Sequence, residues 1–216
     1  MKLRGLIRRG FWELALLIAV FMGALLFVGW HDVPAKTSAA VAFQNGWAKL
    51  AKKPPEAIQL QVAPKSQRPT LPTGCEITDV AMLLQFRGQP QTLTQIAQEI
   101  PYADNPEDGF WGNPFNDTGY TMYPPAWRDY FTKHLGSFTD LSQRSPQAFR
   151  QQLAAGKPVV CWVVMHGFSA HAILLTGFTG DTFIYNDPYT GQSQQRISTQ
   201  RLWRLAASQH HRAMTY

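Results

Sequence analysis

The stretch "LPTGCEITDVAMLLQF" (residues 71–86) joins a turn containing proline and glycine to an apolar run through a single cysteine. Four apolar residues recur at i, i+3, i+4 and i+7, the spacing that predicts a helix with one buried face. They are Ile77, Val80, Ala81 and Leu84. Cys75 follows Gly74 at the start of this helix, where unpaired N–H groups and the helix dipole lower the pKa of a thiol. The sequence therefore predicts a reactive cysteine, with a small core residue as the alternative.

The first thirty residues differ in composition from the rest of the chain. Residues 1–30 hold four basic residues and one acidic residue, and the run from Leu14 to Trp30 is uncharged. About twenty apolar residues can cross a bilayer as a helix, so residues 11–30 predict a transmembrane anchor. The basic flank favours a cytoplasmic N-terminus and an extracellular C-terminal domain at the cell membrane. A cleaved signal peptide, which would make the protein secreted, is the alternative, because residues 34–40 include small residues.

The rest of the chain divides into a linker and one domain. Residues 31–56 are rich in small and basic residues and predict a stalk, and residues 57–216 are enough for one domain with a buried core. The formal net charge is +6, and residues 1–30 supply +3 of it (four basic residues less one acidic residue). No block of Lys and Arg is interleaved with aromatic residues, so nucleic acid is not an expected partner. We expect a monomer.

The apolar periodicity changes from helical to alternating along this domain. Helices are predicted at residues 75–86, 92–100, 126–135, 145–156 and 198–207, with Ser145 and Ser198 as N-caps. Strands are predicted at residues 57–63, 157–165, 171–178 and 181–186. Residues 101–125 are rich in turn formers and aromatic residues and predict an ordered loop. Helices followed by an antiparallel sheet indicate an α+β fold.

The two cysteines of an exported chain raise the question of a disulfide. Cys161 lies in "PVVCWVVM", a pattern typical of a buried strand, whereas Cys75 opens a helix. We therefore predict that the two are not bridged. No cluster of His and Cys has the sequence spacing of a metal site, so neither a metal nor another cofactor is expected.

A base and an orienting group for Cys75 follow from the predicted hairpin. His171 begins the strand "HAILLTGF", and Asp187 ends the next strand, in "YNDPYTG". A hairpin about residues 179–181 places the two almost opposite each other, within side-chain contact. The alternatives are a hydrogen-bonded strand histidine and an aspartate that only stabilises a turn. His166 is a second candidate base, but only His171 is expected to pair with the strand of Asp187.

An acyl-transfer site also needs donors for an oxyanion. The backbone N–H of Cys75 is one, and Gln67, in the proline-rich loop upstream, can reach the same cleft. Gln67 as a loop-stabilising amide is the alternative, and Gln61 is a weaker candidate donor because it falls in a predicted strand.

The combination of "SQRPTLPTGCEITDVAMLL" with "HAILLTGF" and "YNDPYTG" resembles the papain-like cysteine peptidases of the bacteriocin-processing type (family C thirty-nine). It is most similar to their stand-alone, exported relatives with an N-terminal anchor. The resemblance spans about residues 57–206 and implies a papain-like fold. It also implies Cys75 as nucleophile, His171 as general base and acid, Asp187 as its orienting group and Gln67 as oxyanion donor.

These patterns predict a membrane-anchored cysteine peptidase or amide hydrolase. Its expected partners are peptide or protein substrates at the cell envelope, and no cofactor is implied. One alternative is a non-catalytic module that binds peptides or cell-wall fragments on the same fold. Another is an acyltransferase or transpeptidase, in which an amine replaces water.

Overall fold

The computed structural model describes residues 18–21 and 55–216 of the chain. The predicted anchor (residues 11–30) and stalk (residues 31–56) lie almost wholly outside these ranges, and residues 18–21 are helical and exposed. Within the described ranges, no helix has both the length and the apolar character needed to cross a membrane. The predicted domain, residues 57–216, is described throughout.

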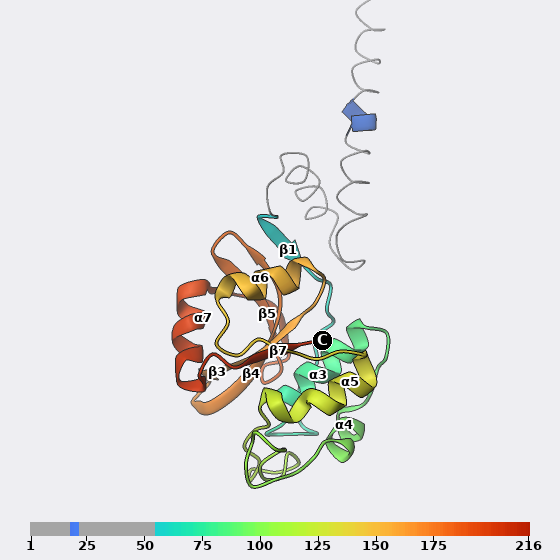
Figure 1. The fold of residues 1–216 in the computed structure, drawn as a ribbon, viewed down its shortest axis with the longest axis vertical. Coiled ribbons are helices and arrows are strands. Elements are labelled where there is room, and N and C mark those ends of the chain that lie inside the picture. Colours follow the sequence, from blue (N-terminus) through green and yellow to red (C-terminus); the bar gives the residue numbers. More distant parts are fainter. Residues whose placement is uncertain (1–17, 22–54) are drawn as a thin grey trace, which may run out of the picture.

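The domain has a helical first half and a sheet-forming second half, as predicted (Figure 1). Its first helices lie together on one side, and the sheet carries two further helices, α6 and α7, on the other. The helices are α3 (Cys75–Phe86), α4 (Leu93–Glu99), the 3-10 turn η1 (Pro124–Trp127), α5 (Arg128–Leu135), α6 (Pro146–Ala154), α7 (Thr199–Ala206) and the 3-10 turn η2 (Ala207–Gln209). The α+β prediction is confirmed.

The sheet is antiparallel, with the strand order β2-β7-β3-β4-β5-β6 and with β1 paired to β4. Its strands are β1 (Ala57–Gln59), β2 (Thr139–Asp140), β3 (Val159–Met165), β4 (Phe168–Thr179), β5 (Thr182–Asp187), β6 (Gln192–Ser198) and β7 (Ala213–Thr215). Strand β4 is central, because it pairs with β1, β3 and β5. It begins at Phe168, three residues before the predicted start, so His171 lies inside the strand.

Helix α3 is more deeply buried than its apolar pattern predicts. Every residue except Gln85 is buried, including the polar Glu76, Thr78 and Asp79. The predicted apolar face is fully inaccessible, and the helix packs against β4, α4 and β3. A helix that is covered all round carries its polar groups into the interior, which sets the electrostatics of the residues near Cys75.

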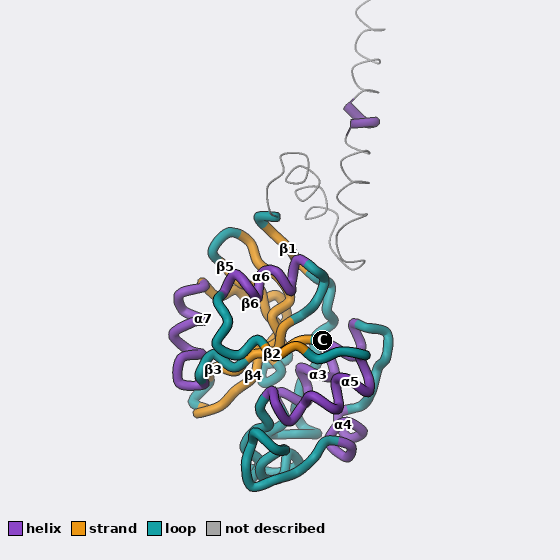
Figure 2. The backbone as a smooth tube through the Cα atoms, viewed as in Figure 1, coloured by secondary structure: helices purple, strands orange, loops and turns teal. Residues whose placement is uncertain are grey.

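The loop over residues 101–125 is ordered, as its aromatic content predicts. Figure 2 shows it as a long teal segment at the lower end of the molecule. Trp111 and Tyr120 pack edge to face with ring centroids 5.3 Å apart. The backbone N–H of Tyr120 donates to the carbonyl of Trp111, whose own N–H donates to the carbonyl of Thr121. Trp162 of β3 is fully buried and donates its ring N–H to Thr121 at 3.0 Å. The loop is therefore fixed to the sheet.

The helix caps follow the sequence in part. Ser198 accepts a hydrogen bond from the backbone of Arg201 at 3.2 Å, as an N-cap should. Ser145 occupies the N-cap position of α6, but its side chain makes no capping bond. Pro146 occupies the first helical position, and Gly156 adopts a left-handed φ of 82° after the helix ends.

Gly177 of β4 lies directly against the backbone of β1, with which β4 pairs. A Cβ there would lie 2.1 Å from the backbone oxygen of Ile58, which leaves no room for a side chain. Gly177→Ala should lower the free energy of unfolding by about 1–3 kcal/mol, the usual cost of overpacking. Urea denaturation measures this loss. Gly180→Asn is the control, because Gly180 has a left-handed φ of 52° and nothing within 4 Å of an added Cβ. Equal stability of the two variants would contradict the close approach.

Candidate active site

Cys75 is the first residue of α3 and borders a cleft of about 380 Å³. The cleft is formed by the loop before α3, by the loop over residues 101–125 (the aromatic loop) and by the first part of β4. Cys75 is 5% exposed, whereas Cys161 is fully buried in β3. Both thiols are free, so the prediction that they are not bridged is confirmed.

Helix α3 meets strand β4 at the thiol. The backbone N–H of Ala172 donates a hydrogen bond to Cys75 Sγ at 3.3 Å. His171, the residue before Ala172, lines the same cleft as Cys75. The fold therefore brings together a thiol and an imidazole that are distant in the sequence.

The ring of His171 is held by Asp187. His171 Nε2 lies 3.0 Å from Asp187 Oδ1, and His171 is only 2% exposed. A carboxylate accepts hydrogen bonds, so Nε2 carries the proton and the lone pair of the neutral ring belongs to Nδ1. In the described part of the chain, Nδ1 makes no hydrogen bond to another group, and none joins His171 to the Cys75 thiol. Nδ1 is the nitrogen that can take a proton.

The predicted hairpin is confirmed, and its register places Asp187 close to His171. Leu174 pairs with Asn186, so Asp187 lies diagonal to His171 rather than opposite it. Diagonal neighbours on one sheet face are within reach of long side chains, which explains why the hydrogen bond still forms.

His166 also binds Asp187, which corrects the expectation that only His171 would pair with that strand. His166 Nε2 lies 2.6 Å from Asp187 Oδ2. The residue has a left-handed φ of 56° in the β3–β4 turn, and its ring stacks on Tyr189. The sequence pattern missed this pairing because a tight turn, not strand register, directs the side chain to the carboxylate.

Three hydrogen bonds hold Asp187 in its ionised form. Burial by itself would raise the pKa of Asp187, but the hydrogen bonds from His171 and His166 outweigh it. The backbone N–H of Tyr189 adds a third bond, to Oδ1, at 2.9 Å. The net effect lowers the pKa below its usual range, so the carboxylate stays charged and keeps Nε2 of His171 protonated.

The thiol of Cys75 is not activated in the manner that its position on α3 predicts. Burial raises its pKa well above the usual value, and the charge of Glu76 raises it further. The bond from Ala172 lowers the pKa but does not compensate. Cys75 Sγ lies 3.2 Å from Glu76 Oε2, to which the S–H donates. The prediction of a lowered pKa was wrong, because desolvation outweighs the helix terminus.

Glu76 is a site residue that the sequence patterns did not reveal. It is fully buried, and its Oε1 accepts a hydrogen bond from the backbone of Met122 at 2.6 Å. Burial raises the pKa of Glu76 to about 7. The available signal was a carboxylate directly beside the cysteine at the start of a helix with a predicted buried face.

Asp79 is a second carboxyl group in the interior of α3. It is fully buried, and neither oxygen has a hydrogen-bond partner among the residues that the structure describes. Burial, then the charges of Asp187 and Glu76, raise its pKa well above the usual value. The protonated, neutral form is the one that such surroundings favour.

Gln67 lies in the cleft, where the sequence places it, and is 2% exposed. Its Nε2 donates to the backbone oxygen of Pro72 at 2.6 Å, and its backbone N–H donates to Pro188. The side chain thus braces the loop and also borders the space beside Cys75, so both interpretations of Gln67 retain support. Gln61 is exposed and does not line the cleft.

The sequence spacing predicts no metal site, but the fold brings three possible metal ligands together. His166, His171 and Asp187 each offer a ligand atom, and these three atoms lie within 4.8 Å of one another. They come from a turn and from two strands, so their sequence spacing gave no sign of the cluster.

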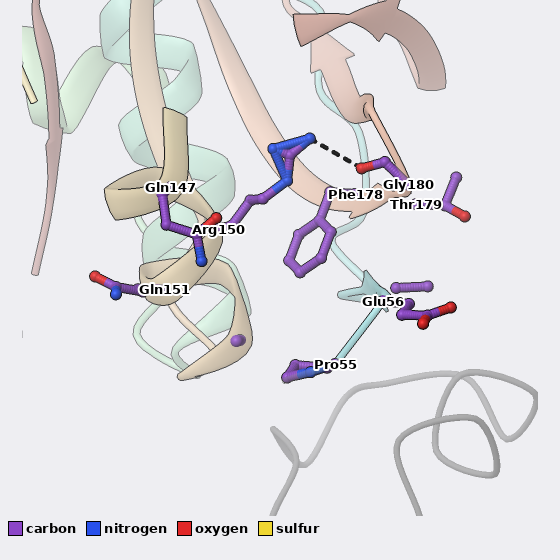
Figure 3. Close-up of a pocket in the computed structure, with 10 residues that line it drawn as sticks. Pro55, Glu56, Gln147, Arg150, Gln151, Phe178, Thr179 and Gly180 are labelled. Atoms are coloured by element: carbon purple, nitrogen blue, oxygen red, sulfur yellow. Dashed lines mark hydrogen bonds between the residues drawn. The ribbon is translucent and has the colours of Figure 1, made fainter. Parts of the chain in front are cut away.

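A second hollow, of about 570 Å³, lies between α6 and the paired strands β1 and β4 (Figure 3). Arg150 lies against it and donates to the backbone oxygen of Gly180 at 2.9 Å. Among the described residues, no cysteine or histidine lines this hollow. It therefore offers none of the chemistry found at Cys75.

Comparison with known proteins identifies similar chains. Residues 59–211 match the model of the Peptidase_C39 like family. The uncharacterized protein YvpB of Bacillus subtilis (strain 168) is 29% identical over 173 residues, which cover 65% of this chain and 69% of YvpB. The crystal structure of a "putative C39-like peptidase" from Bacillus anthracis superposes with a TM-score of 0.69. That chain is 23% identical, and the match covers 74% of this chain and 97% of the other.

The contact between Glu76 and the thiol leads to a test by alkylation. Glu76→Gln removes a negative charge beside Cys75 but keeps an acceptor for Met122, so the pKa of the thiol should fall. Iodoacetamide should then label Cys75 at lower pH than in the wild-type chain, while Cys161 stays unlabelled. The rate of labelling against pH, with peptides mapped by mass spectrometry, measures the shift.

The control for this measurement is Glu99→Gln. Glu99 is an acidic residue that pairs with His134 and Lys133 and does not line the cleft. Identical labelling profiles for Glu76→Gln and the wild-type chain would show that Glu76 does not govern the thiol.

Proposed function

The chain belongs to the Peptidase_C39 like family, and on this premise we propose that it is a cysteine hydrolase of peptide or amide bonds. One observation carries the proposal. His171, oriented by Asp187 at 3.0 Å, lies next to the residue whose N–H binds Cys75 Sγ, and both side chains border one cleft. A nucleophile, a base and an orienting group in this order are the requirement for covalent acyl transfer.

The proposed mechanism uses Nδ1 of His171, because Asp187 already binds Nε2. His171 Nδ1 takes the thiol proton, and Cys75 Sγ attacks the carbonyl carbon to form a tetrahedral adduct. The backbone N–H of Cys75, in the first turn of α3, and Gln67 Nε2 donate hydrogen bonds to the oxyanion. His171 then protonates the departing amine, and water hydrolyses the thioester with His171 as base.

Glu76 holds the thiol at rest in this scheme. The S–H donates to Glu76 Oε2, so the free site contains a neutral thiol rather than a thiolate. A substrate that fills the cleft replaces water around the thiol, and the proton passes to His171 as the carbonyl arrives. The proposed resting state is therefore weakly reactive toward small electrophiles.

A second function has an observation in its favour. The raised pKa of Cys75 suits a module that binds peptides in the same cleft without cleaving them. The two functions differ in their need for the thiol: a binding module retains its activity without it, whereas a hydrolase does not.

Substitutions at the proposed triad separate these functions. Cys75→Ala should abolish turnover of a fluorogenic peptide library, and His171→Ala should be nearly as damaging, because both proton transfers depend on the ring. Asp187→Asn should lose less activity, since an amide still orients the imidazole. Gln67→Ala should lower kcat by about 10²–10³-fold if its amide binds the oxyanion.

The matched control is Cys161→Ala, which removes the other thiol from the buried interior of β3. It should retain turnover, provided that circular dichroism shows a folded chain. If peptide binding and biological activity both survive Cys75→Ala, the binding module replaces the hydrolase.

We also propose that residues 11–30 anchor the protein in the cell membrane, with the domain facing outward toward peptide or protein substrates of the envelope. The support is the uncharged run from Leu14 to Trp30 and the basic flank before it.

This topology has a simple test by fractionation. The full-length mass should be found in the membrane fraction, and protease added to intact cells should release the domain. A mature N-terminus between Val33 and Ala40 would instead show that the segment is a cleaved signal peptide and the protein is secreted.

A further inference from the structure

The cluster of His166, His171 and Asp187 has more ligand capacity than a catalytic triad needs. A triad uses one imidazole on the carboxylate, whereas here both oxygens are occupied, Oδ1 by His171 at 3.0 Å and Oδ2 by His166 at 2.6 Å. All three ligand atoms lie within 4.8 Å of one another. In a tetrahedral zinc site, bonds of about 2.0–2.2 Å place neighbouring ligand atoms about 3.3 Å apart. The cluster needs only small displacements to reach that spacing.

We propose that His166, His171 and Asp187 form a binding site for a divalent transition-metal ion, with Zn²⁺ as the ion that suits them best. Two neutral imidazoles and one carboxylate are ligands that Zn²⁺ prefers, and three protein ligands leave a fourth position for water. The ion replaces the two ring protons that now point at Asp187. In each ring the proton moves from Nε2 to Nδ1, so both imidazoles stay neutral.

The surroundings hold these ligands in place. The backbone N–H of Tyr189 donates to Asp187 Oδ1 at 2.9 Å, and the Tyr189 ring stacks on His166 with centroids 5.0 Å apart. Such outer contacts orient ligands and raise metal affinity. Asp187 and His171 are each 2% exposed, whereas the His166 side chain is 28% exposed, so the ion enters from the side of His166.

The effect on the reaction rests on the proposed function. With the ion on Nε2, the proton of the His171 ring sits on Nδ1, the nitrogen that must accept the thiol proton. The ring then has no lone pair for Cys75. Zinc bound at this site therefore inhibits the reaction reversibly. It prevents His171 from accepting the thiol proton and does not bind the thiol.

Zinc binding is measured on the full chain carrying Cys75→Ala, which excludes zinc bound through the thiolate and does not depend on catalysis. Isothermal titration with Zn²⁺ should show one equivalent bound. Adding His166→Asn should weaken binding by at least about tenfold, which is the lower end of the loss caused by removing even an outer-shell partner. X-ray absorption of the zinc-loaded Cys75→Ala chain should show two imidazole ligands, and this measurement needs no change at His166.

The matched control is His210→Asn in the same background. His210 and His166 both have left-handed φ angles, of 52° and 56°, a conformation that Asn tolerates, and His210 is exposed away from the cleft. His210→Asn should leave zinc affinity unchanged. Absence of zinc binding by Cys75→Ala, equal affinity with and without His166, or fewer than two imidazole ligands would each overturn the site. Loss of the peptidase hypothesis alone would leave these results unaffected.

Discussion

The position of the α3 N-terminus against strand β4 determines the rest of the site. The contact is direct, because the N–H of Ala172 binds Cys75 Sγ across 97 positions of sequence. The chain enters α3 through Gly74, where a Cβ would lie 2.6 Å from Cβ of the buried Leu71. Only glycine permits that close turn, and only that turn places the thiol on the central strand. The strand in turn pairs on both sides and cannot shift without disrupting the sheet.

The same packing buries three carboxyl groups, and burial affects the protonation state of each one differently. Asp187 is ionised because two imidazoles and a backbone N–H donate to it. Glu76 accepts hydrogen bonds from the Cys75 thiol and from the backbone of Met122, but burial outweighs them and raises its pKa to about 7. Asp79 has no hydrogen-bond partner in the described part of the chain and is favoured as the neutral acid. Burial raises the pKa of all three carboxyl groups, and only at Asp187 do the hydrogen bonds outweigh it.

Local patterns predicted the elements that carry strong periodicity or a clear cap. The α3 helix, the hairpin of β4 and β5, the Ser198 cap and the convergence of Cys75, His171 and Asp187 all follow from spacing and turn residues. Strand β6 was missed because "QSQQRIS" has a single buried residue, so its pairing with β5 rather than its composition makes it a strand. Strands β2 and β7 are only two and three residues long, and β2 is held by its pairing with β7, which in turn pairs with β3.

What the sequence could not supply was the environment of the charged groups. The helix terminus was visible, but the burial that raises the pKa of Cys75 was not, because it arises from the aromatic loop and β4 closing over the thiol. Glu76 likewise acquires its role from Met122, 46 positions away. The pKa of a group depends on distant segments, so motif spacing finds the reactive atoms more readily than their protonation states.

The shared carboxylate explains why orienting a base and binding a metal are closely related here. Hydrogen bonds to both Oδ1 and Oδ2 restrict the rotation of the Asp187 carboxylate, which in turn orients the ring of His171. Two imidazole nitrogens directed at one carboxylate are also the donor set of a zinc site, which small displacements of the ligands and a shift of each ring proton to Nδ1 would complete. The second histidine therefore restricts the movement of the proposed base. For the same geometric reason, it offers a metal ion a second imidazole ligand beside that base.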